Sequence, residues 1–486
     1  MNLELLRPEL TLLATAAAVI LADLFVKRKG YLTVLSVIGL LVAGLFTILM
    51  WDNGPQSIFN NLLVVDNFAL FFKVLLLGIS IIVILSSTDY VGKLANLHGE
   101  YHALILLSTL GLILITSATE LITLYVSLEV SSLSLYALTG FLKDQKSSES
   151  SLKYLLLGAV SSAVLLYGMA LIFGYTGSTQ LGEIADAIQK TASSNLLDNP
   201  GLVAGIALLV AGLGFKIAAV PFHLWVPDVY EGAPTPITGF LSVASKAAGF
   251  AFVIRVFFTA FEMPEWLSLD WGTVYAVLAV IGMFIGNVSA IAQSNIKRLL
   301  GYSSIAQAGY LMVGLATIGM APASEIIGRS SILFFLFSYA LANLGAFAAI
   351  IAITNKIKSD EIKDFAGMGR RSPLMALALT VCLISLIGMP PASGFIAKFY
   401  IFNGAVQNGL LWLVIIAVLN SVISAFYYLR VVKVMWFNEP LSTEKVSSSG
   451  ALRFALLITS LGVLFVGILP GFVLKLAEWA AQMIGF

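Results

Sequence analysis

The chain has 486 residues, of which 59% are hydrophobic and only 11% are charged. Because soluble proteins carry about 25% charged residues, this composition excludes an ordinary soluble domain. The net charge of +1 gives no basic footprint for nucleic acid. Cys382 is the only cysteine, which excludes an internal disulfide and a cysteine-ligated zinc or iron–sulfur site.

Apolar runs of about 20 residues recur along the whole chain, which predicts an all-α polytopic membrane protein. We predict about fourteen helical spans. In chain order they cover 8–26, 31–50, 69–87, 103–118, 120–141, 152–175, 202–225, 235–258, 273–293, 298–318, 328–353, 374–404, 409–435 and 452–482. The first run is not expected to be a signal peptide, since its lead-in MNLELLRPE has mixed charge and no small-residue cleavage site follows.

Charge alternates between the predicted loops, and this alternation gives an orientation. Loops on one side are basic and include Lys27, Arg28, Lys29, Lys143, Lys297 and Arg298. The opposite stretches 176–200 and 259–272 are mainly acidic. Since positive loops stay in the cytoplasm, both termini are predicted on the outer side of the cell's inner membrane.

Spans 4–8 and 9–13 form two blocks of five, and an odd number per block predicts an inverted repeat. We therefore expect divisions at 1–102, 103–258, 273–435 and 452–486. Spans 7 and 12 occupy the same position in their blocks, and both combine a lysine with helix breakers. These breakers are Gly214 and Pro221 in span 7, and Pro390, Pro391 and Gly394 in span 12. Interrupted spans in corresponding positions indicate a transport site.

Four charges lie inside these apolar runs: Glu129, Lys216, Lys246 and Lys398. A charge near the centre of a spanning helix costs roughly 2.5–3.5 kcal/mol on insertion scales, and such groups usually line an ion or proton path. Burial disfavours a charged amine, whereas a nearby carboxylate favours it. An amine held between these influences can take up and release a proton. Glu129 is the only acid predicted deep in a span, so it is the expected partner of Lys216, with Lys246 as the next acceptor.

Polar residues could bridge the gaps between these charges. The candidates are Ser242, Ser245, Ser303, Ser304, Gln307, Tyr339 and Asn343. Other charges have simpler interpretations. Lys73, Lys153 and Arg255 lie near span ends, where long basic side chains often extend to the headgroups.

Three further points stay open from the residues alone. The break at Gly388–Gly394 could let the chain leave the membrane before Lys398. The four prolines Pro221, Pro227, Pro234 and Pro236 predict a rigid, non-helical connection, in which His223 is more often structural than a proton carrier. Asp228 and Glu231 could guide protons or cap helix ends.

The segment LGFKIAAVPFHLWVPDVYEGAPTPITGFLSVASKAAGFA resembles the central signature of the antiporter-like subunits of complex I. The stretches SLEVSSLSLYAL, NIKRLLGYSSIAQAGY and IGMPPASGFIAKFYIF agree, and the likeness covers nearly the whole chain. The serine–lysine of LSVASKAA is most similar to the subunit N branch. The chain is also expected to lack the long lateral helix of the subunit L branch.

The resemblance implies that Glu129, Lys216, Lys246 and Lys398 form a proton relay driven by quinone chemistry in other subunits. It implies no cofactor on this chain, and as partners the neighbouring antiporter-like and quinone-site membrane subunits. Gln307 stands where relatives often have histidine, so a carrier there is in doubt. Two rival functions remain: a subunit of a multisubunit monovalent cation/proton antiporter, and a structural chain that anchors partners. The electron donor, the quinone and the proton count are not readable from this sequence.

Overall fold

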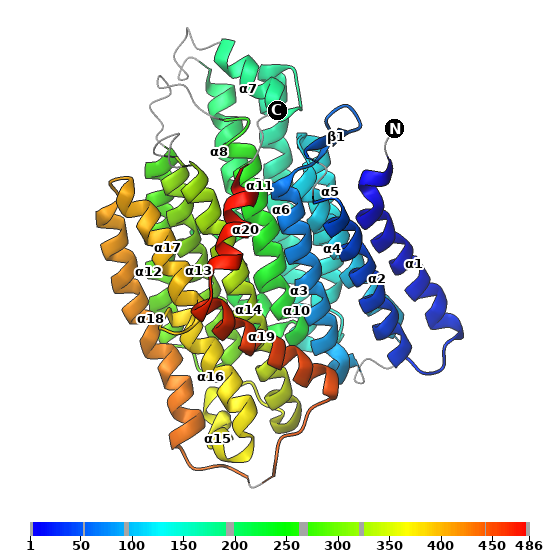
Figure 1. The fold of residues 1–486 in the computed structure, drawn as a ribbon, viewed down its shortest axis with the longest axis vertical. Helices are drawn as coiled ribbons and strands as arrows, with labels where there is room; N and C mark the ends of the chain where they lie inside the picture. The colour runs from blue at the N-terminus through cyan, green and yellow to red at the C-terminus, as the bar shows by residue number, and fades with distance from the viewer. Residues whose placement is uncertain are drawn as a thin grey trace.

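The structure is a computed structural model of a long helical bundle (Figure 1). Its described residues are 3–51, 54–91, 97–190, 199–261, 271–319, 325–442 and 444–482. Most of the acidic stretch 259–272 lies outside these ranges, as do the last four residues of the predicted division 452–486.

The N-terminal region begins with a 3₁₀ turn, η1 (Leu3–Leu6), and the two peripheral helices α1 (Arg7–Phe25) and α2 (Gly30–Leu49). A short antiparallel hairpin follows, β1 (Gln56–Ile58) with β2 (Leu63–Val65), in which Ser57 pairs with Val64. This hairpin was not predicted from the sequence. The third helix, α3 (Asn67–Val91), then returns through the bundle.

The first predicted block of five spans is present in the expected order. Its elements are α4 (His98–Ser117), α5 (Leu121–Thr139), α6 (Gln145–Thr176), α7 (Leu181–Lys190), α8 (Pro200–Ile217), α9 (Trp225–Gly232), α10 (Thr235–Phe240), the π-helix η3 (Leu241–Ser245) and α11 (Lys246–Phe257). Local sequence fixes several ends. Asp144 caps α6 by accepting from the Ser147 amide at 2.8 Å, and Gly177 ends this helix in the left-handed conformation, at φ +73°.

The chain then passes through the region predicted as the second block. Its elements are α12 (Trp271–Ile291), α13 (Ile296–Ile318), α14 (Glu325–Ile357), the 3₁₀ turn η6 (Ile362–Phe365), α15 (Met368–Arg371), α16 (Pro373–Ile387), α17 (Ser393–Gln407) and α18 (Leu411–Phe437). Two helices, α19 (Gly450–Ile468) and α20 (Gly471–Ala481), end the bundle.

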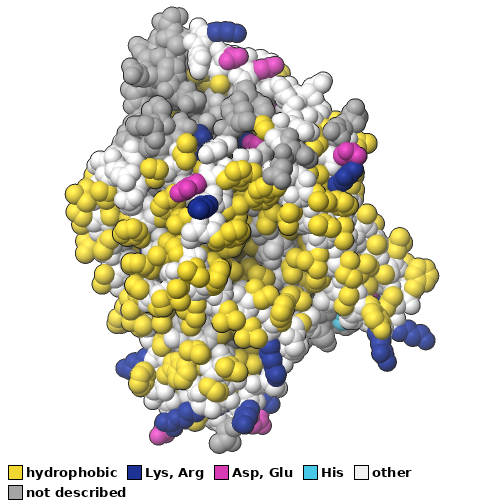
Figure 2. All heavy atoms as spheres, in the orientation of Figure 1, with side chains coloured by type: hydrophobic (Ala, Val, Ile, Leu, Met, Phe, Trp, Pro, Cys, Tyr) yellow, Lys and Arg dark blue, Asp and Glu magenta, His cyan; other side chains and the backbone are white. Residues whose placement is uncertain are grey.

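In the described part of the chain, 13 helices are long and apolar enough to cross a membrane. The interrupted pair α16–α17 supplies the remaining predicted span, so the all-α polytopic prediction is confirmed. Figure 2 shows a continuous belt of apolar side chains with charged groups gathered toward the two ends. The segment 235–257 and α13 are each 94% buried in their most apolar windows, against 33% for α2 and α19. The centre of the bundle therefore lies where the two blocks meet.

Two predictions about irregular segments were wrong. The proline-rich connection contains a helix, because Pro227 is the third residue of α9 and Pro236 the second residue of α10. A missing N–H costs no hydrogen bond in the first turn of a helix. The predicted last span, 452–482, is divided into α19 and α20 at Leu469–Pro470.

Lys73 and Arg255 do not extend to the headgroups as the sequence predicted. Lys73 in α3 is fully buried and lies 2.7 Å from the carboxylate of Glu9 in α1. Arg255 at the end of α11 is 1% exposed, and its guanidinium donates to both carboxylate oxygens of Asp66 at 2.6 Å. Their partners Glu9 and Asp66 are distant in sequence and lie near the ends of other spans. The sequence around each base therefore could not predict the ion pair.

Candidate functional site

Lys216 lies in the last turn of α8, just before the interruption that the sequence predicted. The helix ends at Ala218, whose φ of +60° is left-handed, and the chain resumes as α9. The indole of Trp225 donates to the Phe215 carbonyl at 3.0 Å, which satisfies a backbone group freed by the break. A positive charge at a helix C-terminus is electrostatically favourable, so the end of α8 stabilises the charged form of Lys216.

The Lys216 ammonium reaches the polar face of α5. It donates to the Ser132 hydroxyl at 2.8 Å, and Ser132 lies three residues beyond Glu129 on the same helix. Glu129 itself accepts a 2.5 Å hydrogen bond from Ser162 of α6. Glu129 is half-buried and not deep in the bundle as the sequence predicted. Its carboxylate is hydrogen-bonded to Ser162, while the Lys216 ammonium is hydrogen-bonded to Ser132.

Glu129 is partly exposed because of its position around α5. Ile122, Val126 and Leu133 are 54–60% exposed, and they stand seven and three residues before Glu129 and four residues after it. At helical spacing these positions share one face, so Glu129 flanks the outward stripe of α5. A carboxylate there lies inside the apolar belt and beside the outer surface of the bundle.

Lys246 is the first residue of α11 and directly follows the π-helix η3. Its ammonium donates to the Ser304 hydroxyl of α13 at 2.8 Å, and to the Ser304 carbonyl. The hydroxyls of Tyr339 and Tyr230 also reach the Ser304 hydroxyl, at 3.1 and 3.3 Å. Ser304 therefore joins Lys246 to both tyrosines. Single π-helical turns inside α-helices occur frequently at functional sites.

Lys398 lies in α17, beyond the second interruption, so the chain does not leave the bundle before it. Its ammonium donates to the Ile387 carbonyl and to the Ser421 hydroxyl, each at 2.9 Å. It also lies 4.1 Å from the ring centroid of Tyr310, a cation–π contact. Ile387 is the last residue of α16. The carbonyl exposed by the break is thus one of the lysine's acceptors.

Two small cavities lie next to the buried lysines. One, of about 20 Å³, lies between Lys216 and the helix that carries Lys246, and its polar lining includes Ser131, Ser132 and Ser245. The other, of about 10 Å³, lies beside Lys398 and includes Gln307 and Tyr339. A cavity needs roughly 10–15 Å³ and polar partners to hold a water. Both spaces therefore suit a single bridging water.

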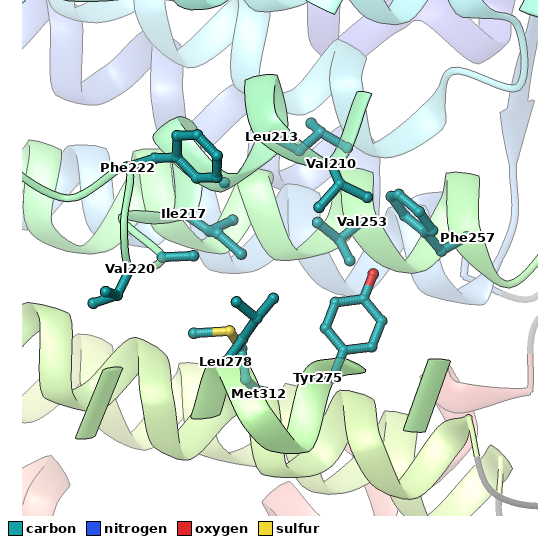
Figure 3. A pocket seen from close by; sticks show the side chains of 12 residues that line it. Val210, Leu213, Ile217, Val220, Phe222, Val253, Phe257, Tyr275, Leu278 and Met312 are labelled. Carbon is teal, nitrogen blue, oxygen red and sulfur yellow. The ribbon is translucent and has the colours of Figure 1, made fainter. Parts of the chain in front are cut away.

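A third cavity beside the α8 break has the opposite character. Figure 3 shows Phe222, Val220 and Ile217 on one side of this space and Leu278 and Met312 on the other. Its volume is about 40 Å³ and its lining is almost entirely apolar. Apolar cavities stay dry, so this cavity offers no water-filled connection between the charged side chains.

The residues predicted to bridge the four charges differ in whether they contact one of the lysines. Tyr339 and Ser304 contact each other and Lys246, as described above. Asn343 donates to Ser242 at 2.6 Å, Ser303 bonds the Tyr428 hydroxyl, and Gln307 donates to the Leu386 carbonyl at 3.0 Å. The sequence reasoning missed Ser132, Ser162 and Ser421. The run SLEVSS, with two serines one turn after the glutamate, was the available signal for Ser132.

Asp228 and Glu231 of α9 take part in an ion-pair cluster. Asp228 accepts from Lys153 of α6 at 2.9 Å and from Arg298 of α13 at 2.6 Å; Glu231 lies 3.1 Å from Arg298. Burial alone would raise the pKa of the Asp228 carboxyl, but these two hydrogen bonds outweigh it and hold the pKa below its usual range. Lys153 is therefore paired as well as partly exposed. His223 is buried in the connection between α8 and α9.

The sequence also matches a known family over most of this machinery. A family model described as NADH:quinone oxidoreductase/Mrp antiporter, transmembrane, covers residues 118–424. The chain belongs to this family. Relatives in it include NADH-quinone oxidoreductase subunit N of Dehalococcoides mccartyi, 50% identical over 99% of this chain and 100% of the relative. The subunit N of Trichlorobacter lovleyi is 45% identical over 99% of this chain and 98% of its own length.

Three solved structures have the same fold. A chain of respiratory complex I from Thermus thermophilus is 32% identical, with a TM-score of 0.81 over 97% of this chain and 99% of that one. A chain of the archaeal membrane-bound sulfane sulfur reductase is 27% identical, with a TM-score of 0.88 over 99% and 97%. A chain of the Mrp complex from Dietzia is 20% identical with a TM-score of 0.85 over 99% and 97%, which is a likeness of fold alone.

Proposed function

We propose that this chain is the antiporter-like, proton-translocating subunit N of a respiratory complex I, an NADH-quinone oxidoreductase. It contributes to a translocase without carrying out redox chemistry, and quinone reduction in other subunits drives it. The full-length relatives with this name support the assignment. We expect it to bind no cofactor and to lie among other antiporter-like and quinone-site subunits in the cell's inner membrane.

The observation that carries the proposal is the arrangement of the three lysines. Each ammonium hydrogen-bonds to a serine hydroxyl, on Ser132, Ser304 and Ser421. A hydroxyl both accepts and donates, so it can pass on the proton that the lysine releases. The breaks next to Lys216 and Lys398 free backbone carbonyls at the same places. In the proposed relay Glu129 and Lys216 exchange charge through the Ser132 side of α5, and protons pass on to Lys246 and Lys398.

Glu129 also supports assembly with a neighbour. An ionisable group inside the membrane almost always faces protein or water, yet this one flanks an outward stripe. A neighbouring membrane subunit that covers α5 would bury it and could influence its charge. The division of the chain into an N-terminal unit 1–102, repeats 103–258 and 273–435, and a C-terminal unit from 452 belongs to the same proposal.

Substitution of the lysines tests this function. Arginine keeps its charge essentially always and methionine carries none, so a carrier should tolerate neither. We expect Lys216→Arg, Lys216→Met, Lys246→Arg and Lys246→Met to lose most proton pumping in vesicles driven by the complex's own electron donor. Lys356, an exposed lysine paired with Glu444, is the matched control, and both changes there should leave pumping intact.

Assembly of each variant complex is measured first, because loss of one buried charge can destabilise a protein. Full pumping by an assembled Lys216→Arg complex would show that the site needs only a fixed charge. The antiporter alternative makes a separate prediction. If the chain is an antiporter subunit, the Lys246 variants should lose sodium or potassium movement together with proton movement. If it is a complex I subunit, they should lose the proton pumping that is coupled to quinone reduction.

A further inference from the structure

A large groove lies between the N-terminal helices and the start of α19, and its lining contains none of Lys216, Lys246 and Lys398. It has a volume of about 470 Å³ and is formed by α2, α3 and the first residues of α4 and α19. Its walls are apolar and include Val34, Ile38 and Leu85. This volume falls within the roughly 300–1,000 Å³ of ordinary ligand pockets.

One end of the groove is polar. Lys29, Thr33, Thr88 and His98 line it there, and all four come from the end at which α2 and α4 begin and α3 finishes. Thr33 lies 3.2 Å from the His102 ring nitrogen, and the Thr88 hydroxyl lies 3.0 Å from that of Ser449. These side chains have partners within the chain, so a polar rim held by the chain's own contacts borders the apolar walls.

Three consecutive basic residues, Lys27, Arg28 and Lys29, lie at this end. Lys29 is balanced by Asp23, whose carboxylate lies 2.6 Å from its ammonium. The neighbouring Lys27 and Arg28 are exposed, and neither forms an ion pair with a described residue. The nearby acid Asp89 is engaged in capping α19, where it accepts from the Ser449 amide at 2.9 Å. In Figure 2 dark blue side chains stand at the lower end of the lobe that α1 and α2 form in Figure 1.

We propose that this groove is a binding site for one anionic phospholipid, such as phosphatidylglycerol. The phosphate lies at the Lys27–Arg28–Lys29 turn, and an acyl chain lies along the apolar walls. Basic pockets between membrane helices on the cytoplasmic side bind anionic headgroups for the same electrostatic reason. The bound lipid connects α2, which is largely peripheral, to α3, α4 and α19. This site does not depend on the proposed proton relay.

The test uses the intact complex in phosphatidylcholine vesicles that contain photoactivatable phosphatidylglycerol or, separately, photoactivatable phosphatidylcholine. Labelled residues are mapped by mass spectrometry of the chain. We expect the phosphatidylglycerol probe to label groove residues preferentially. The double variant Lys27→Gln/Arg28→Gln should reduce that labelling by about fivefold for each basic side chain removed. The matched control Arg370→Gln/Lys433→Gln removes the same charge from exposed positions outside the groove and should change nothing.

A second pair of variants tests the acyl chain. Val34 and Leu45 lie on α2 and are each 54% exposed, but only Val34 lines the groove. Val34→Trp should abolish groove labelling by the lipid, whereas Leu45→Trp should not. Equal labelling by the two lipid probes, or labelling unaffected by Lys27→Gln/Arg28→Gln, would overturn headgroup recognition. Protection of the groove by a helix of another subunit, detected as a protein cross-link at Val34, would overturn lipid as the occupant.

Discussion

At the residue scale, Gly388 shows how closely the second break is fitted to its lysine. Its φ of +90° is left-handed, and a Cβ at this position would meet Cδ of Lys398 at 2.8 Å. Gly409 is also left-handed, with φ +77°, but has nothing within 4 Å. Alanine at either position should cost about 1–2 kcal/mol of backbone strain. Only alanine at position 388 would also displace the Lys398 side chain.

We therefore predict that Gly388→Ala reduces proton pumping in assembled complex, whereas Gly409→Ala lowers thermal stability by a similar amount and keeps pumping. The two measurements are the midpoint of thermal unfolding and pumping in vesicles. Equal losses of pumping in both variants would mean that backbone strain, and not displacement of Lys398, limits function.

The four charges of the proposed relay could be picked out from the sequence because a charge inside an apolar run is conspicuous. Of their hydroxyl partners, Ser304 was among the candidates named from the sequence, whereas Ser132 and Ser421 were not, since serine occurs throughout these helices and the fold selects which ones reach a lysine. The prediction that Lys73 and Arg255 extend to the headgroups was wrong for a related reason. Distance from a span end says nothing about whether Glu9 or Asp66, on other helices, can reach the base.

The Lys73–Glu9 pair gives a second test at the residue scale. Both side chains are at most 6% exposed, and removal of one partner of a buried pair typically costs 3–5 kcal/mol, since it leaves the other charge uncompensated. We predict that Lys73→Met and Glu9→Leu each lower thermal stability strongly. The double variant Lys73→Met/Glu9→Leu should recover much of the loss, because both charges are then gone. If the losses were additive, the two side chains would not be coupled.

At the element scale, the broken helices were predictable and their geometry was not. Glycine and proline beside each lysine marked where α8 and α16 stop. The prolines of 221–236 were interpreted as excluding a helix there. The helix α9 forms nevertheless, because Pro227 lies in its first turn. The break between α19 and α20 was missed because a single proline, Pro470, follows a long apolar run.

The helix α9 joins the two blocks through its ion pairs, and this attachment can be tested by pH. Since Lys153 and Arg298 hold the pKa of Asp228 below its ordinary value of 3.8, the carboxylate stays charged across about pH 5–8. Its contribution to stability is lost only as pH falls through that lowered pKa. These side chains are about one-third exposed, so Asp228→Asn should cost only about 1 kcal/mol.

We predict that the difference in thermal stability between the unsubstituted chain and Asp228→Asn is constant from about pH 5 to 8 and shrinks below about pH 4. Unfolding curves of the purified protein at each pH measure it. A difference that grows or fades within the neutral range would show that another titrating group controls α9.

At the scale of the whole molecule, composition and span count gave the architecture, because each span is long, apolar and separated by a charged loop. Orientation rests on weaker evidence, the distribution of lysine and arginine. Figure 1 shows the start of α1 and the end of α20 toward the end of the bundle where α7 lies, with the α1–α2 turn toward the opposite end. This arrangement supports an even number of crossings, and the basic loops favour placing the termini outside.

Cysteine labelling can decide the orientation, because the chain has one natural cysteine, Cys382, and it is fully buried. Gln189 in α7 and Arg28 in the α1–α2 turn are both exposed and lie at opposite ends. With the termini outside, a membrane-impermeant maleimide added to intact cells should label Gln189→Cys and leave Arg28→Cys unlabelled until the membrane is permeabilised. Cys382→Ala serves as the background in both cases, and labelling of Arg28→Cys alone in intact cells would reverse the proposed orientation. Because the lipid groove opens toward the Arg28 end, the same result would also identify the leaflet that supplies its phospholipid.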